Sequence, residues 1–262
     1  MSQSPFIAVD IGNTRTKFGL FDGGARGGLP EPTTTVEMLT ERFTQRRLAD
    51  WLKENSIVDV AWYIGSVHQK ATATLFDWLG RGGSPEIRAE ILDYRRFPIQ
   101  LAVEHPEKTG IDRIAGAVAA NRIRKPDEPA IIVDAGTALT VDLVAADGVF
   151  RGGAILPGIG MSARALHEFT DQLPLIPMSE LLEPPPALGT STVPAMQSGL
   201  YWGAVGAMRE LISRLSEGQA KPPLVILTGG AAPAVAKLLG PAARYEPNLV
   251  LSGIALAASK PN

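Results

Sequence analysis

The 262-residue chain contains no cysteine. This absence excludes disulfide bonds, thiolate nucleophiles and zinc sites with cysteine ligands, and it is compatible with a reducing compartment. Histidine is scarce as well, and His68, His105 and His167 are scattered without the spacing of metal ligands. We therefore expect no metal-binding or catalytic role for the histidines, and we expect a cytoplasmic protein.

An excess of charge of either sign is also missing, because 25 basic residues nearly balance 27 acidic ones. Without a basic field the chain is not expected to bind nucleic acid. Long hydrophobic runs are missing too: the first apolar run ends at Asp10, and no basic segment precedes it. We predict neither a signal peptide nor a membrane span, and no membrane partner.

Two common nucleotide-binding motifs do not occur in the sequence. There is no G-x-x-x-x-G-K followed by Ser or Thr, and no G-x-G-x-x-G after a predicted strand. A nucleotide, if one binds, must be held in another way.

What is present is an internal repeat. Each half opens with an apolar strand, an Asp-x-Gly turn that contains Thr, a second strand and an Asp-Gly turn. These features occupy 6–11, 10–14, 17–21 and 22–23 in the first half, and 130–133, 134–137, 139–144 and 147–148 in the second. The alternative is two unrelated hairpins. The repeat favours two similar lobes, and the polar segment 124–129 suggests a division into 1–125 and 126–262.

Alternating strands and helices follow each hairpin, which is typical of an α/β lobe with a mixed sheet covered by helices. The periodicity predicts a helix over 40–55 capped by Thr40. Further strands are expected at 58–65, 86–92 and 224–227, and further helices at 70–79, 114–123, 193–215, 232–239 and 249–258.

The two turns carry groups that suit phosphate. Gly12 allows close backbone approach, Asn13 and Thr14 add side-chain donors, and Lys17 adds a positive charge. Asp10 ends an apolar strand, where its carboxylate could hold a cation or its waters. The alternative is a purely structural role, in which these residues only form turns. Because the pattern occurs twice, directly behind buried strands, we favour phosphate binding and expect Asp134 and Thr137 to act from the second lobe.

Three other segments are candidates for a site. Gly229 and Gly230 follow a strand, where they would let a flat adenine or ribose approach, although a tight turn explains them almost as well. Asp112 begins a predicted helix, where it could be a structural N-cap or the carboxylate that accepts a proton from a hydroxyl. The glycine-rich stretch 152–162 could line a cleft, form a hinge wall or be a tight crossover.

Six motifs occur in the order found in type III pantothenate kinases, which the chain therefore resembles over nearly its whole length. They are Asp10-x-Gly12-Asn13-Thr14, Gly110-x-Asp112-Arg113, Asp134-x-Gly136-Thr137, Gly152-Gly153-x-Ile155-x-Pro157-Gly158, Gly189-x-x-Thr192 with Ala195-Met196-Gln197-Ser198-Gly199, and Thr228-Gly229-Gly230. This family has the fold of acetate and sugar kinases, Hsp70 and actin. The resemblance thus implies two duplicated ribonuclease H-like lobes with ATP in a cleft between them.

The resemblance also implies an activity, which is transfer of the ATP γ-phosphoryl group to the terminal hydroxyl of pantothenate, the first step of coenzyme A synthesis. It implies Asp112 as the general base and Asp134 as ligand of a monovalent cation such as K⁺ or NH₄⁺. It also implies Mg²⁺ with the nucleotide, and Asp10 is the candidate that would hold it through water. The ATP contacts that it implies are Asp10, Gly12, Asn13, Thr14, Lys17, Gly136, Thr137, Gly229 and Gly230.

On the acceptor side, the resemblance implies pantothenate contacts at Gly110, Ile111, Arg113 and Thr192, with Thr192 supplied by the partner in a homodimer. Relatives usually carry a Tyr where this chain has Val103, and this departure concerns acceptor binding. Two alternatives stay open: a kinase of the same fold acting on another hydroxy acid or sugar, and a catalytically silent regulatory protein. Intact Asp112, Lys17 and Asp134 argue against silence.

Overall fold

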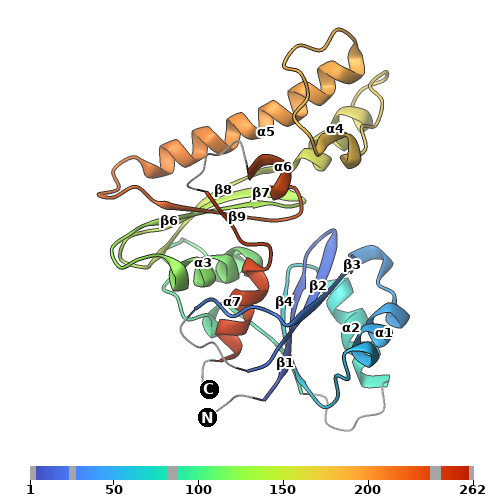
Figure 1. Ribbon diagram of the computed structural model, residues 1–262, viewed down its shortest axis with the longest axis vertical. Helices are drawn as coiled ribbons and strands as arrows, with labels where there is room; N and C mark the ends of the chain where they lie inside the picture. Colours follow the sequence, from blue (N-terminus) through green and yellow to red (C-terminus); the bar gives the residue numbers. More distant parts are fainter. Residues whose placement is uncertain (1–3, 24–27, 82–87, 237–242, 260–262) are drawn as a thin grey trace. The chain divides into compact units, whose positions relative to one another are not determined.

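The computed structural model describes residues 4–23, 28–81, 88–236 and 243–259. The chain divides into two compact units (Figure 1). The first unit comprises Met1–Ile123 and Asn248–Asn262, and the second comprises Arg124–Pro247. The division after Ile123 lies next to the polar segment 124–129.

The first unit contains a five-stranded mixed sheet. Its order is β3 (Thr34–Leu39), β2 (Arg15–Phe21), β1 (Phe6–Ile11), β4 (Ala61–Ser66) and β5 (Ala89–Ile91). The strands β1, β2 and β3 are antiparallel neighbours, whereas β4 and β5 run parallel to β1. Residues 86–87 of the predicted strand 86–92 lie outside the described residues.

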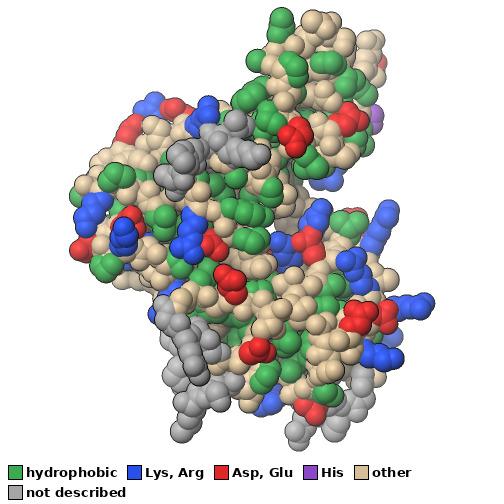
Figure 2. Space-filling view, viewed as in Figure 1, with side chains coloured by type: hydrophobic (Ala, Val, Ile, Leu, Met, Phe, Trp, Pro, Cys, Tyr) green, Lys and Arg blue, Asp and Glu red, His purple; other side chains and the backbone are tan. Residues whose placement is uncertain are grey.

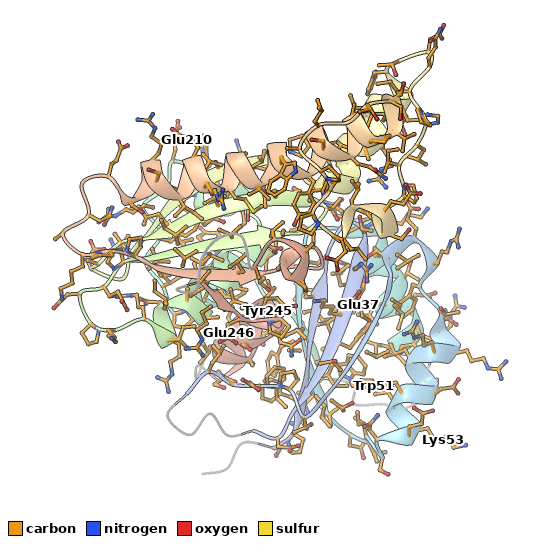
Figure 3. All side chains as sticks on the ribbon, turned by 45° about the horizontal axis from the view of Figure 1, so that its top comes forward. Glu37, Trp51, Lys53, Glu210, Tyr245 and Glu246 are labelled. Carbon is orange, nitrogen blue, oxygen red and sulfur yellow. The ribbon has the colours of Figure 1, made fainter. Side chains whose placement is uncertain are left out.

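Helices cover both faces of this sheet because the side chains of β1 alternate between two apolar cores. Ile7, Val9 and Ile11 pack with the helices α1 (Gln45–Glu54) and α2 (Gln69–Arg81). Figure 3 labels Trp51 on α1, and its indole nitrogen donates to Thr34 Oγ1 at 3.2 Å. Phe6 and Ala8 face the other way, toward α3 (Ile111–Ile123) and α7 (Leu249–Ala258).

The last helix, α7, belongs to the first unit. The predicted division into 1–125 and 126–262 placed it in the second lobe, and the structure corrects that assignment. Nearly every residue of α7 is buried, so the helix needs apolar neighbours all round. Gly253 permits the close contact with α3, since a Cβ there would lie 1.9 Å from the carbonyl oxygen of Ala115.

The second unit repeats the sheet of the first. Its order is β8 (Phe150–Pro157), β7 (Ala138–Val144), β6 (Ala130–Ala135), β9 (Leu224–Thr228) and β10 (Arg244–Tyr245). The β6, β7 and β8 strands are antiparallel neighbours, and β9 and β10 run parallel to β6. Order and direction therefore match those of the first sheet strand for strand, and the predicted duplication is confirmed.

One face of the second sheet packs on the long helix α5 (Thr192–Ser216) and on α6 (Ala232–Ala236). A separate apolar cluster joins α5 to α4 (Ile159–Glu168) and the short 3-10 helix Met178–Leu181. Residues 237–239 of the predicted helix 232–239 lie outside the described residues. Within the described part of the chain, no helix is long and apolar enough to cross a membrane.

The predicted helix 40–55 is wrong at its beginning. Residues Thr40–Arg42 form a 3-10 helix, and α1 begins only at Gln45. Thr40 caps no helix: its buried hydroxyl donates to the carbonyl oxygen of Gly12 at 2.8 Å. A long-range partner in the turn after β1 thus replaces the local cap that the sequence suggests.

Candidate functional site

The first Asp-x-Gly turn joins β1 to β2 and is closed by backbone hydrogen bonds. The amide of Gly12 donates to the carbonyl oxygen of Arg15 at 3.0 Å, and the amide of Thr40 donates to that of Thr14 at 2.9 Å. A Cβ on Gly12 would lie 3.0 Å from the Arg15 carbonyl oxygen. The turn is therefore tight, and the residue that follows β3 stabilises it through a backbone hydrogen bond.

Asp10, Lys17 and Glu37 form one row across β1, β2 and β3, because each faces the next in the strand register. Lys17 Nζ lies 3.5 Å from Glu37 Oε2, and Arg15 forms an ion pair with the same carboxylate. Figure 3 labels Glu37 on β3. With Arg15 at its end, the row gathers two cations and two carboxylates beside the turn. Glu37 is a member that the sequence did not indicate.

The predicted acceptor motif lies at the beginning of α3, above the same sheet. Gly65 on β4 pairs with Asp10, and a Cβ there would lie 2.9 Å from Ile111 Cγ2. Asp10 follows Ala8 by two residues, so its side chain is on the face of β1 that α3 and α7 cover. Asp10 and Asp112 therefore lie on the same face of the first sheet, at the carboxyl end of β1.

Asp112 is the second residue of α3 and not its N-cap. Its Oδ1 accepts a hydrogen bond from the amide of Arg113 at 2.8 Å. Burial raises the pKa of Asp112 above its ordinary value of 3.8, opposed by that hydrogen bond and by the charge of Arg113. Because the charged form is desolvated, the carboxylate gains by taking up a proton, which suits a general base.

The second Asp-x-Gly turn joins β6 to β7 in the second unit. The Gly136 amide donates to the Ala138 carbonyl oxygen at 3.1 Å. Asp134 Oδ1 lies against Gly229, where a Cβ would be only 2.3 Å from it and where φ is +92°. Only glycine fits this position. Gly230 has open space where a Cβ would stand, so the backbone at Gly230 is accessible.

The glycine-rich stretch that the sequence left open is mainly the strand β8. A Cβ on Gly153 would lie 2.1 Å from the Val141 carbonyl oxygen, so Gly153 permits the close pairing of β8 with β7. Gly158 follows β8, and its amide donates to the Thr137 carbonyl oxygen at 3.1 Å. The stretch thus supports the second turn.

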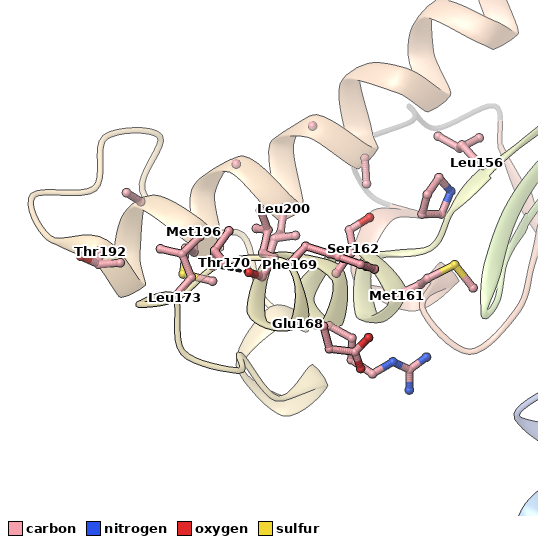
Figure 4. A pocket seen from close by; sticks show the side chains of 18 residues that line it. Leu156, Met161, Ser162, Glu168, Phe169, Thr170, Leu173, Thr192, Met196 and Leu200 are labelled. Carbon is pink, nitrogen blue, oxygen red and sulfur yellow. Dashed lines mark hydrogen bonds between the residues drawn. The ribbon is translucent and has the colours of Figure 1, made fainter.

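Beyond β8 the second unit carries an apolar groove of about 1080 Å³ between α4 and α5 (Figure 4). The residues that line it include Leu156, Met161, Phe169, Thr192 and Leu200. Phe169 is 84% exposed, which is unusual for so large an apolar side chain. Figure 2 shows hydrophobic side chains at the surface in this part of the second unit. Such a surface is typical of an interface.

The motif around Thr192 holds the beginning of α5. A Cβ on Gly189 would lie 2.2 Å from the Ala195 amide nitrogen. Ser198 donates to the Ala187 carbonyl oxygen at 2.7 Å, and Trp202 donates to that of Pro185 at 2.9 Å. These hydrogen bonds bind the loop before α5 to the helix. Thr192, the first residue of α5, is exposed at one end of the groove.

Val103, the histidines and the predicted cation sites complete the list of residues considered from the sequence. Val103 is half-buried and lies just before the 3-10 helix Pro106–Lys108. His68 Nδ1 accepts from the Ala71 amide at 3.2 Å. The described residues contain no cluster of three or more His, Asp or Glu that could hold a metal. A cation at Asp10 or Asp134 would need oxygen ligands from phosphate, carbonyls or water.

Comparison with known proteins gives consistent results. The family profile described as type III pantothenate kinase matches residues 6–214. The type III pantothenate kinase of Paramagnetospirillum magneticum is 34% identical over 258 residues, covering 95% of this chain and 94% of that one.

Among solved structures, the ethanolamine utilization protein EutJ from Carboxydothermus hydrogenoformans matches with a TM-score of 0.53 at 14% identity, over 98% of this chain and 90% of that one. The archaeal actin homolog Ta0583 matches with a TM-score of 0.51 at 13% identity, over 97% and 99%. These two structures bear on the fold alone. Together with the two matching sheets, they establish duplicated lobes of the actin type.

Proposed function

The chain belongs to the type III pantothenate kinase family, and from this membership we infer that it is an ATP-dependent pantothenate kinase. The reaction transfers the γ-phosphoryl group of ATP to the terminal hydroxyl of pantothenate and opens coenzyme A synthesis. The observation that supports it most is the placement of Asp10, the first turn and Asp112 at one end of the first sheet.

Asp112 is the general base in this proposal. It accepts the proton of the pantothenate hydroxyl as that oxygen attacks the γ-phosphorus, and the bond from phosphorus to the β,γ-bridging oxygen breaks. Its raised pKa makes it a stronger base than an exposed aspartate. Arg113 binds the pantothenate carboxylate, because the guanidinium fork matches a carboxylate bidentately. Gly110, Ile111 and Val103 form the wall beside them.

ATP takes its phosphate contacts from the turn of each unit. Gly12, Asn13, Thr14 and Lys17 act from the first, and Gly136 and Thr137 from the second. Both turns present backbone amides, which suit anionic oxygens. The open space beside Gly230 suits the adenosine part of the nucleotide.

Two cations complete the proposal. Asp134 would hold a monovalent cation, K⁺ or NH₄⁺, because its carboxylate is fixed against Gly229 at the strand end. Mg²⁺ would accompany ATP, and Asp10 would hold it through water. Either cation would offset the negative charge of the phosphates.

The enzyme is a homodimer in this proposal, and the groove between α4 and α5 faces the second copy. The groove is apolar, and exposed Phe169 is one of the residues that line it. Contact with a second copy would remove this surface from water. Thr192 at the end of the groove would then reach the partner's acceptor site. A location in the cytoplasm stays a prediction.

A coupled assay of ATP consumption tests the activity. We expect turnover with pantothenate and none without an acceptor. Turnover with another hydroxy acid or sugar but not pantothenate would favour a different acceptor, for which Val103 in place of the family's usual Tyr is the specific reason. Absence of turnover with every acceptor would indicate a silent homologue.

The cation assignment is tested with the Asp134→Ala variant, assayed in K⁺ and in Na⁺. We expect stimulation of the wild-type enzyme by K⁺ and its loss in the variant, because the carboxylate ligand is gone. Asp147→Ala, at the exposed turn after β7 where Asp147 pairs with Arg151, is the control. An undiminished K⁺ response in Asp134→Ala would reject the assignment.

A further inference from the structure

The hydroxyl of Thr40 is the least expected contact of the first turn. Thr40 is 4% exposed and Thr16 is 2% exposed, so both hydroxyls are buried beneath the turn. Thr40 Oγ1 donates to the Gly12 carbonyl oxygen at 2.8 Å and lies 3.0 Å from Thr16 Oγ1. A hydroxyl has one hydrogen to donate, and Thr40 gives it to Gly12. Thr16 must therefore donate to Thr40, which makes a chain from Thr16 through Thr40 to Gly12.

This chain has a geometric consequence for the neighbouring peptide. The C=O and N–H groups of a trans peptide point in opposite directions, and the described residues contain no cis peptide. Because the carbonyl of Gly12 points toward Thr40, the N–H of Asn13 points away from it, out of the buried side of the turn. Thr40 thus fixes the direction of a backbone donor.

The second unit has the same backbone contact at the equivalent place. Thr40 follows β3 and its amide donates to the Thr14 carbonyl oxygen; Gly158 follows β8 and its amide donates to the Thr137 carbonyl oxygen. The second unit has no side chain in the place of Thr40, because a Cβ on Gly158 would lie 2.4 Å from the Gly136 carbonyl oxygen. Direct backbone packing in the second unit takes the place of the hydroxyl in the first.

We propose that Thr40, supported by Thr16, is a positioning residue that holds the Gly12–Asn13 peptide with the Asn13 N–H directed at a phosphate oxygen of ATP. The inference rests on the proposal that the first turn binds ATP. Thr40 acts through the peptide and does not contact the nucleotide. A fixed donor costs no reorganisation when the phosphate arrives, which favours binding and transfer.

The test compares Thr40→Val with Thr40→Ser in steady-state kinetics. Valine keeps the shape but leaves the half-buried carbonyl of Gly12 without its donor, so we expect the KM for ATP to rise about tenfold. The KM for pantothenate at saturating ATP is expected to stay within about twofold. Thr16, which contacts Thr40, shares its face of β2 with Phe18 and lies on the α1 and α2 side of the sheet, whereas the acceptor motif on α3 lies on the other side. Thr40→Ser restores the hydroxyl and is expected to restore the KM for ATP.

Thr33→Val is the matched control. Thr33 Oγ1 also donates to a backbone carbonyl, that of Leu20 at 3.2 Å, but at the opposite end of the same strand pair and in an exposed position. We expect its kinetics to equal those of the wild type. An unchanged KM for ATP in folded Thr40→Val, an equal rise in Thr33→Val, or failure of serine to restore the value would each overturn the proposal.

Two further variants keep the outcome decisive. If Thr40→Val does not fold, Thr16→Val removes only the support of Thr40, and an unchanged KM for ATP there would overturn the inference. Lys17→Ala distinguishes failure of the hydroxyl chain from failure of the proposed ATP site. If Lys17→Ala raises the KM for ATP and Thr40→Val does not, the turn binds ATP without the hydroxyl chain; if neither does, the phosphate site itself is misplaced.

Discussion

At the scale of single residues, the burial of Asp112 has opposite consequences for proton affinity and for stability. The carboxylate is half-buried at the beginning of α3 and its pKa is raised by that burial. A base that is poorly solvated binds protons more readily, but its charged form is less stable in the folded protein. The sequence identified Asp112 from its motif, whereas the desolvation depends on α3 and its neighbours and needed the structure.

The raised pKa predicts how stability depends on pH. Between the ordinary value of 3.8 and the higher folded-state pKa, the folded protein binds more protons than the unfolded chain, so stability falls as pH rises through this window. Above the window the loss is complete. Asp112→Asn has no carboxyl to ionise, so it does not lose stability in this window. Its unfolding free energy minus that of the wild type should therefore increase with pH across the window and then level off.

Urea unfolding from pH 4 to pH 8 measures the difference. Asp50→Asn is the control, because Asp50 is an exposed residue of α1 that lies 3.9 Å from Arg46. We expect the control to show no such increase. A neutral-pH stability of Asp112→Asn below that of the wild type would contradict the assigned cause.

At the scale of elements, the sequence predicted most helices and both hairpins but missed β3, β8 and β10. Glycine obscures β8, because Gly152 and Gly153 have low strand propensity. Gly153 permits the close pairing with β7, and Gly152 has a φ of +85° at the register shift between the two strands. Thr40 was assigned to a helix cap on a local pattern, but its partners lie in the first turn. Such errors are expected where a contact distant in sequence overrides a local preference.

Gly158→Ala tests the link between β8 and the second turn. The φ of Gly158 is −66°, which alanine adopts freely, so only the clash with the Gly136 and Thr137 carbonyl oxygens matters. We expect a loss of about 1–3 kcal/mol in unfolding free energy and a raised KM for ATP.

Gly206→Ala serves as the comparison, because Gly206 lies in α5 with nothing within 4 Å of a Cβ. It should gain up to about 1 kcal/mol from better helix propensity. Equal effects of the two substitutions would show that the turn does not depend on Gly158.

At the scale of the whole molecule, the internal repeat was predictable because each half begins with the same strand and turn chemistry. The assignment of α7 was not, since a helix that is apolar all round does not indicate which sheet it covers. The groove between α4 and α5 was also missed, because its lining comes from β8, α4 and α5 together.

The proposed homodimer predicts complementation between subunits. Thr192→Arg and Asp112→Asn are each expected to be inactive. When the two are mixed and allowed to exchange, half of the dimers are mixed, and each mixed dimer has one site with Asp112 from one subunit and Thr192 from the other. Activity should return to about a quarter of the wild-type value. If Thr192 serves its own subunit's site, the mixture stays inactive.

The central claim is that Asp112 takes the proton from the acceptor while the turns hold ATP. Turnover and nucleotide affinity of Asp112→Asn, measured on the same preparation, test it most directly. We predict that turnover with pantothenate falls about 10²- to 10⁴-fold while the Kd for ATP stays near the wild-type value. Turnover close to that of the wild type would contradict the account.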